Sequence, residues 1–283
     1  MALQRISLER AQEEFPDHDL TEHLKSGGQK DVFVGSWDGE EIVLKTVIVD
    51  SYEASRRAKR EVEAMKKIES DILVDLKQAF PASIEDHDVF VMVEERIPGL
   101  TLRDYLNENG PSIELGFKVT ETLLTVLQEF NQKEMVHRDI KPRNIMVTPE
   151  GEIKVLDVGV VRMLNEEGLT PTARNAAPGT PKYSSPEQLQ NSKDKQDTRT
   201  DLFSTGIVMS ECITGKHPFE DRGLPIQEAI HTGEWQEFED VLDSPLTEYL
   251  DYFLEFMLSP SMNNRFNTPK DALDSLMRIQ GMT

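Results

Sequence analysis

The sequence predicts an α+β fold of two lobes, a small lobe that is mostly β followed by a larger lobe that is mostly α-helical. Residues 21–49 contain short β-branched runs separated by glycine-containing turns, which is the pattern of a meander of strands. Residues 51–68 carry apolar residues at the spacing of one amphipathic helix. From Pro98 onward the pattern is mainly helical. No internal repeat or long linker interrupts the chain, so we expect one cooperative domain.

The small lobe is preceded by a segment of different character. Residues 1–20 are charged, with a partly helical pattern that ends near Pro16, and we expect a short N-terminal extension here. After the predicted helix, strand-like runs occur at residues 72–76 and 89–93. These runs complete a small lobe that we place at about residues 21–96.

The larger lobe is expected at about residues 98–281, which gives a domain over residues 21–281. Its helices should be long, each with one apolar face turned to the core. The three clearest windows are residues 114–133, 201–214 and 247–258.

Composition narrows the classes of function. The chain has 283 residues with 52 acidic against 31 basic side chains, a formal net charge of −21. That charge would repel nucleic acid and anionic lipid, so we expect neither as a partner. No apolar run approaches the roughly 20 residues of a membrane helix, the N-terminus lacks a secretory pattern, and Cys212 is the single cysteine. We expect a cytoplasmic protein, and we expect it as a monomer or weak dimer.

The clearest motif is the run from His137 to Asn144. Transfer of a phosphoryl group needs an acceptor near the attacking hydroxyl, a cation near the migrating group and an amide oxygen for a metal ion. Asp139, Lys141 and Asn144 supply these groups within one turn. A chance match to the whole motif in this chain would have a probability on the order of 10⁻⁵. We therefore assign Asp139 and Lys141 as catalytic residues and Asn144 as a metal ligand.

A second motif begins at Asp157, in an Asp-Val-Gly tripeptide that follows a short strand-like run. Alone, this tripeptide is typical of an ordinary turn at the end of a strand. It lies 18 residues after Asp139, however, and a β-hairpin between Ile145 and Leu156 would return the chain to the same cleft. We expect Asp157 to hold Mg²⁺ together with Asn144.

With these motifs the chain resembles the eukaryotic-type (Hanks-type) serine/threonine protein kinases and is similar to bacterial members of that superfamily. The resemblance covers nearly the whole chain and implies the bilobal protein kinase fold, with one regulatory helix in the β-rich lobe. It implies transfer of the γ-phosphoryl group of ATP to serine and threonine hydroxyls of protein substrates, with Mg²⁺ as the metal. It also implies that Lys45 binds the α and β phosphates and pairs with Glu61, in preference to Glu63.

The resemblance further identifies the residues that should surround ATP and its metal ion. These cofactor-binding residues are Gly27, Gly28, Val32, Val43, Lys45, Glu61, Glu95, Ile97, Asn144 and Asp157.

The phosphate loop and the back of the nucleotide pocket depart from the family pattern. Lys25 and Lys30 occupy the first and third glycine positions of the phosphate loop, where glycine lets backbone amides approach the phosphates. Lys30 either adds positive charge near the phosphates or points to solvent. At the back of the nucleotide pocket the alignment places Glu94, or Val93 if the register is shifted by one. A carboxylate buried there would seek a cation or a proton.

Downstream, residues 179–187 resemble the segment that docks the residue following the phosphoacceptor, with Ser185 where alanine is usual. This segment favours a protein substrate, because small-molecule phosphotransferases of similar fold lack it. The resemblance also implies that Asp201 braces the catalytic loop and that Glu187 and Arg265 form a buried ion pair. A pseudokinase scaffold and a small-molecule phosphotransferase are the alternatives, and the degenerate glycine loop is the only support for the pseudokinase.

The same resemblance implies regulation by phosphorylation of the activation segment. Arg138 and Arg162 would form the pocket that binds a phosphothreonine. Thr172 is the preferred site and Thr170 the second choice, because the hydroxyl of Thr180 should bond the catalytic residues instead.

Overall fold

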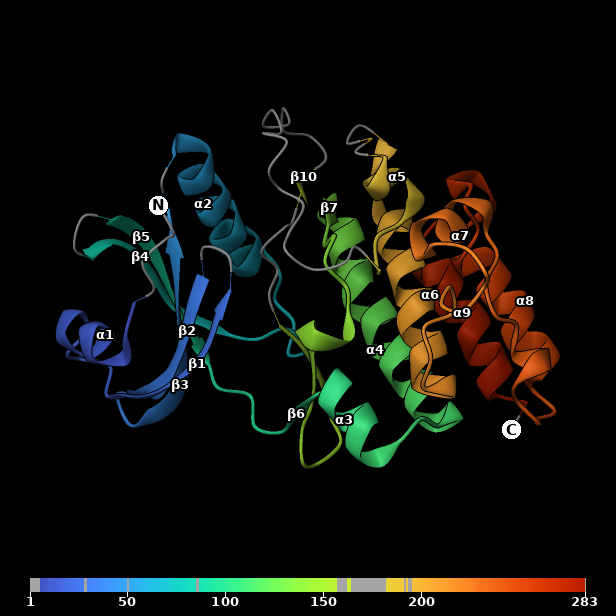
Figure 1. Cartoon of the computed structure of the whole chain (residues 1–283), viewed down its shortest axis with the longest axis horizontal. Helices are drawn as coiled ribbons and strands as arrows, with labels where there is room; N and C mark the ends of the chain where they lie inside the picture. The colour runs from blue at the N-terminus through green and yellow to red at the C-terminus, as the bar shows by residue number, and fades with distance from the viewer. Residues whose placement is uncertain are drawn as a thin grey trace. The chain divides into compact units, whose positions relative to one another are not determined.

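The computed structural model describes residues 6–27, 30–49, 51–84, 87–156, 162–163, 182–190, 192 and 195–282. The chain divides into two compact units, which we call the N-terminal unit (Met1–Pro98) and the C-terminal unit (Gly99–Thr283). The N-terminal unit is built on a sheet and the C-terminal unit is mainly helical (Figure 1). The predicted α+β class with a small β-rich part and a larger α-helical part is therefore confirmed.

A five-stranded antiparallel sheet forms the centre of the N-terminal unit, with strand order β1-β2-β3-β5-β4. A short turn joins β2 to β3, as the meander pattern predicts. The strands are β1 (Leu20–Gly27), β2 (Lys30–Trp37), β3 (Glu40–Ile48), β4 (Leu76–Ile84) and β5 (His87–Glu95).

Alternation along β5 sorts its side chains onto the two faces of this sheet. Val89, Val91 and Val93 belong to the core that α1 (Leu8–Glu14) completes, whereas Phe90 and Met92 pack with α2 (Tyr52–Lys67). The two helices thus cover opposite faces, because successive side chains of a strand point in opposite directions (Figure 1). Odd-numbered residues of β5 therefore face α1 and even-numbered residues face α2.

The segment before the sheet is part of this core. Ser7 caps the start of helix α1, where its hydroxyl accepts a hydrogen bond from the Arg10 N–H, and the helix ends before Pro16. Apolar side chains of this segment pack against the sheet, so the segment is a structural part of the N-terminal unit. The residues that this segment adds to the core are Ile6, Ala11 and Phe15.

One strand differs from its prediction. We expected a strand at residues 72–76, but β4 begins at Leu76 and runs to Ile84. Pro81 within it lowers the strand signal of the sequence, because proline cannot donate to a ladder hydrogen bond. The structure tolerates Pro81 because β4 is the last strand of the sheet and needs only one neighbour, β5.

The C-terminal unit is organised around α6, a helix that is buried on all sides from Leu202 to Ile213. Helices α4 and α9 pack beside it, and α8 lies against it as well (Figure 1). The three predicted helical windows are confirmed as α4, α6 and α8. The helices are α3 (Leu102–Asn109), α4 (Ile113–Gln132), α5 (Pro186–Leu189), α6 (Thr198–Thr214), α7 (Ile226–Thr232), α8 (Thr247–Met257) and α9 (Pro269–Gln280).

Short strands and 3₁₀ turns connect these helices and carry the catalytic motif. Strands β6, β8 and β9 form one small sheet, and β7 pairs with β10 in another. Among the helices that the structure describes, none has the length and apolar character needed to cross a membrane. These elements are β6 (Leu100–Thr101), β7 (Met135–Val136), η1 (Pro142–Asn144), β8 (Ile145–Val147), β9 (Ile153–Val155), β10 (Arg162–Met163), η3 (Phe238–Asp240) and η4 (Met262–Asn264).

Candidate functional site

The loop between β7 and η1 brings together the three residues that the sequence assigns to chemistry. Lys141 Nζ lies 2.7 Å from both carboxylate oxygens of Asp139. Asn144 Nδ2 donates to the Asp139 carbonyl oxygen at 3.0 Å and to Asp139 Oδ2 at 2.8 Å. These bonds fix the orientation of the Asp139 carboxylate.

Asn144 fits the expected role of a metal ligand. Its amide nitrogen is used on Asp139, and its amide oxygen makes neither of these bonds, which leaves an oxygen of the kind that Mg²⁺ prefers. The second expected ligand, Asp157, lies outside the described residues. Among the described residues no group of three His, Cys, Asp or Glu side chains could hold a metal ion. A Mg²⁺ site formed by Asn144 and Asp157 stays a prediction.

The predicted hairpin after the catalytic loop is confirmed. Ile145 of β8 pairs with Val155 of β9, and the turn closes with a hydrogen bond from the Gly151 N–H to the Thr148 carbonyl. The Leu156 N–H then donates to the Asn144 carbonyl at 2.8 Å. The residue before Asp157 is thus returned to the end of the catalytic loop.

Asp201, at the start of α6, braces the catalytic loop as expected. Its two oxygens accept hydrogen bonds from the His137 N–H at 2.8 Å and the Arg138 N–H at 2.7 Å. Burial raises the pKa of Asp201 to about 7, although these backbone bonds act to lower it. Arg138 has a φ of 70°, a left-handed conformation that is unfavourable for a residue with a side chain. The two bonds that Asp201 accepts, and one that Gln188 Nε2 donates to the Arg138 carbonyl at 3.0 Å, hold the loop in this conformation.

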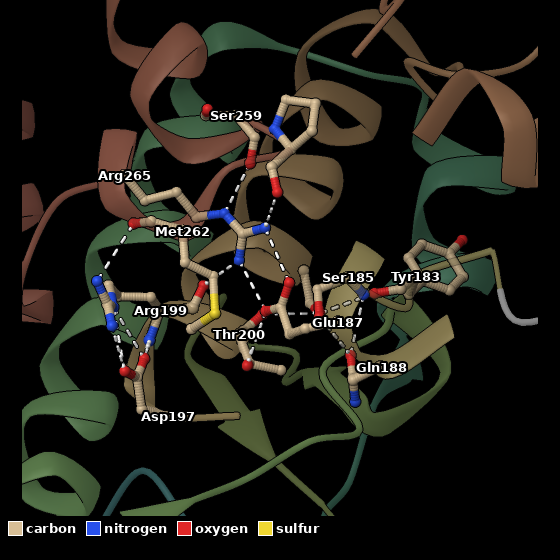
Figure 2. A network of polar contacts seen from close by, with 12 residues as sticks. Tyr183, Ser185, Glu187, Gln188, Asp197, Arg199, Thr200, Ser259, Met262 and Arg265 are labelled. Carbon is tan, nitrogen blue, oxygen red and sulfur yellow. Dashed lines mark hydrogen bonds and ion pairs between the residues drawn. The ribbon is translucent and has the colours of Figure 1, made fainter. Parts of the chain in front are cut away.

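The predicted ion pair between Glu187 and Arg265 is confirmed, and Figure 2 shows the network around it. Arg265 binds Glu187 through two parallel bonds of 2.8 and 3.0 Å, and it also donates to the carbonyls of Ser259 and Arg199. Burial alone would raise the pKa of Glu187, but the bonds from Arg265 outweigh it and hold the pKa below its usual value. Thr200 donates to the same carboxylate at 2.9 Å. The pair therefore connects the start of α5 to the segments around α6 and η4.

A second buried network was not predicted from the sequence. Arg103 on α3 lies 2.8 Å from Glu211 on α6, and the Tyr183 hydroxyl donates to Glu211 at 2.9 Å. Burial, followed by the charge of Glu211, raises the pKa of Tyr183. Arg103 and Glu211 are 108 residues apart, so no local pattern could have indicated that they meet.

In the N-terminal unit, Lys45 has a different partner from the one expected. Its ammonium lies 2.7 Å from Glu94 Oε2, and Lys45 makes no ion pair with Glu61 within the described part of the chain. Glu61 instead lies 3.7 Å from Lys30. The pairing of Lys45 with Glu61 was therefore wrong for this structure. Strand register gives the reason, because Lys45 is opposite Met92 and its diagonal neighbour on the same face is Glu94.

The register also bears on two questions that the sequence left open. Val93 faces the core under α1, whereas Glu94 faces the α2 side together with Lys45. The alternation of side chains along β5 therefore favours Glu94 as the residue at the back of the nucleotide pocket. Lys30 reaches Glu61 rather than pointing freely to solvent. The buried Glu94 carboxylate is thus paired with a cation, the Lys45 ammonium, as a buried charge requires.

The other predicted nucleotide residues have fixed places in the same sheet. Val32 is opposite Lys45, Val43 is opposite Glu94, and Gly27 ends β1 opposite Lys30. Glu95 ends β5, where its N–H donates to the Asp75 carbonyl at 2.9 Å, and the half-buried Ile97 follows. Their contacts to ATP stay predictions. Outside the described residues lie Gly28, Asp157, Thr170, Thr172, Thr180 and the side chain of Arg162.

Comparison with known proteins agrees with this arrangement. A family model described as a protein kinase domain matches residues 20–276. A probable serine/threonine-protein kinase from Clostridium acetobutylicum is 32% identical over 242 residues, covering 84% of this chain and 35% of the relative. A probable serine/threonine-protein kinase from Streptomyces coelicolor is 30% identical over 242 residues, covering 83% and 35%. Serine/threonine-protein kinase PknB from Mycobacterium tuberculosis is 32% identical over 190 residues, covering 66% and 30%. The chain thus spans about a third of the length of these relatives.

Proposed function

The chain belongs to the protein kinase domain family, and from this premise we propose that it transfers the γ-phosphoryl group of ATP to serine and threonine hydroxyls of proteins. The observation that carries the proposal is the cluster of Asp139, Lys141 and Asn144, held by Asp201 in a strained loop. Stored strain of this kind is typical of functional sites. The relatives named as serine/threonine-protein kinases support the choice of acceptor.

Each residue of the cluster has a role in the proposed transfer. Asp139 orients the acceptor hydroxyl and takes its proton as the oxygen attacks the γ-phosphorus. Lys141 places a positive charge beside Asp139, where negative charge develops on the phosphoryl oxygens. Lys45 would bind the α and β phosphates. Mg²⁺, held by Asn144 and Asp157, would neutralise the phosphate charge.

The alternatives are less well supported. A pseudokinase lacks one or more of the residues that hold phosphate and metal, whereas Lys45, Glu61, Asp139, Asn144 and Asp157 are all present. Substitution of glycines by Lys25 and Lys30 is the only feature in its favour. For a small-molecule substrate, the docking-like segment at residues 179–187 would have no use.

Several finer points belong to the same proposal. We place the protein in the cytoplasm because its single cysteine, Cys212, indicates a reducing compartment. We expect a monomer or weak dimer whose activity rises when Thr172, or in second place Thr170, is phosphorylated. Mass spectrometry of the protein expressed alone should detect phosphate on residues 170–172.

The test is incubation of the purified protein with γ-³²P-labelled ATP and Mg²⁺, together with a serine/threonine peptide library. We expect label on the protein and on peptides, and its loss in Asp139→Asn at unchanged melting temperature. Label that is equal in Asp139→Asn and wild type would refute the assignment of the base. Binding of ATP without any transfer by wild type would favour the pseudokinase.

A further inference from the structure

We propose that Glu94, carried by β5, is the residue that positions Lys45 for the nucleotide phosphates, the role that the sequence assigned to Glu61. The proposal rests on the proposed function, because it concerns the residue expected to hold the α and β phosphates. Its basis is the contact of 2.7 Å between Lys45 Nζ and Glu94 Oε2, both of which belong to the same sheet.

Burial makes this pair obligatory for both partners. The Lys45 side chain is 9% exposed and that of Glu94 is 2% exposed, so neither charge is neutralised by water. The other carboxylate oxygen of Glu94, Oε1, is buried with no hydrogen-bond donor among the described residues. Lys45 is therefore the group that balances the charge of Glu94, and Glu94 is the group that orients Lys45.

The position of Glu61 is consistent with this assignment. Glu61 lies 3.7 Å from Lys30, a side chain that is 25% exposed and that projects from β2 on the same face as Lys45. Two lysines and two carboxylates thus share the face under α2, and each lysine has a partner. The shorter and more buried of the two contacts is that between Lys45 and Glu94.

The consequence is a phosphate-binding lysine whose orientation is set within the sheet. Strands β3 and β5 are paired from Ile42 to Ile48 of β3, and Lys45 and Glu94 are diagonal neighbours across them. A small shift of α2 would move Glu61 but would leave both members of this pair in place. Loss of the Glu94 charge should therefore impair nucleotide use more than loss of the Glu61 charge.

The test compares four purified variants with wild type by their kcat, their KM for ATP and their melting temperature. Glu94→Gln keeps the size of the side chain and removes its charge, while Glu94→Asp keeps the charge and shortens the side chain. We expect kcat/KM for ATP to fall about 30- to 100-fold in Glu94→Gln, as misplacement of a positioning group does, and less in Glu94→Asp. A residue that acts only by packing would give the opposite order, with glutamine better tolerated than aspartate.

Two variants on α2 complete the comparison. The fold-loss of kcat/KM for ATP in Glu61→Gln should be no more than about a tenth of that in Glu94→Gln. Glu63→Gln, at an exposed position of the same helix, should have the kcat/KM of wild type. If Glu94→Gln does not fold, the ordering of Glu94→Asp and Glu61→Gln decides, since the account requires the larger loss in Glu94→Asp.

Three outcomes would overturn the proposal: a loss in Glu61→Gln equal to or larger than that in the Glu94 variants, a gain of activity in Glu94→Gln, or better tolerance of glutamine than of aspartate. Absence of transfer by wild type would instead refute the proposed function, so the two failures can be told apart.

Discussion

Asp201 and Arg265 in the C-terminal unit hold their buried charges in a different way from the charged residues beneath α2 in the N-terminal unit. Asp201 accepts from the N–H groups of His137 and Arg138, and Arg265 donates to backbone carbonyls as well as to Glu187. In the N-terminal unit the charged groups beneath α2 contact one another, side chain to side chain, on one face of a sheet. Backbone groups cannot change place without moving the loop, whereas neighbouring side chains can exchange partners. The contacts of Asp201 and Arg265 were predicted correctly, whereas the partners of Lys45 and of Arg103 were not.

Among the substitutions that test this comparison, Arg265→Met should have the largest effect on the free energy of unfolding. Arg265→Met would leave the Glu187 carboxylate buried and unpaired, and it would also remove donors from two backbone carbonyls. We expect the free energy of unfolding to fall by about 3–5 kcal/mol. Urea denaturation of wild type and variant measures this difference.

The matched control is Lys270→Met, which removes an exposed ion pair with Asp274 on α9. This pair should contribute less than about 1 kcal/mol, because water and salt screen exposed charges. Equal losses in Arg265→Met and Lys270→Met would mean that burial of the Glu187 pair contributes little to stability.

A smaller effect is expected at His217, a buried neutral ring in the C-terminal unit. Its Nε2 contacts the Lys182 carbonyl at 2.9 Å, so it must carry a proton, and its Nδ1 accepts the Phe219 N–H. Burial lowers the pKa of His217 to about 4 from an ordinary value of 6.5. The unfolded chain therefore binds more protons between pH 6.5 and pH 4, and stability falls as the pH is lowered through this range.

The measurement is the free energy of unfolding of wild type and His217→Gln across that pH range. Wild type should lose on the order of 2–3 kcal/mol more than the variant. Parallel pH profiles for the two proteins would show that His217 makes no such contribution.

The smallest expected effect on the free energy of unfolding is that of Lys30→Met in the N-terminal unit. Lys30 is partly exposed and its contact with Glu61 is long, at 3.7 Å, so Lys30→Met should lower the unfolding free energy by less than Lys45→Met does. Lys45→Met leaves Glu94 buried without its partner and should cost several times more. Thermal melts of the two variants give the comparison, and equal costs would contradict the ranking of the two pairs by burial.

Sequence periodicity was sufficient for the long elements, because each buries one continuous face. The window at residues 114–133 became α4 (Ile113–Gln132), and the β-branched runs became strands. It failed at β4, where Pro81 is acceptable only because the strand lies at the sheet edge, a fact that the local sequence does not contain.

For the candidate site, local motifs predicted the contacts that arise within a few residues, such as those among Asp139, Lys141 and Asn144. Contacts across the fold were predicted only where the resemblance named both partners, as for Glu187 and Arg265. The partner of Lys45 was not found, because it depends on strand register. Parity along β5 was nevertheless visible in the sequence, and it places Glu94 on the face opposite to Val93.

The most direct test of the account measures ATP binding and phosphoryl transfer in parallel for one variant from each unit. Lys45→Met should weaken Mg²⁺–ATP binding in calorimetry and lower transfer with it, because it removes a phosphate-binding charge. Asp139→Asn should bind Mg²⁺–ATP within about 3-fold of wild type, yet its single-turnover transfer rate should fall about 10²- to 10⁴-fold, the usual contribution of a general base. Transfer by Asp139→Asn at the wild-type rate, with Mg²⁺–ATP bound, would contradict the account.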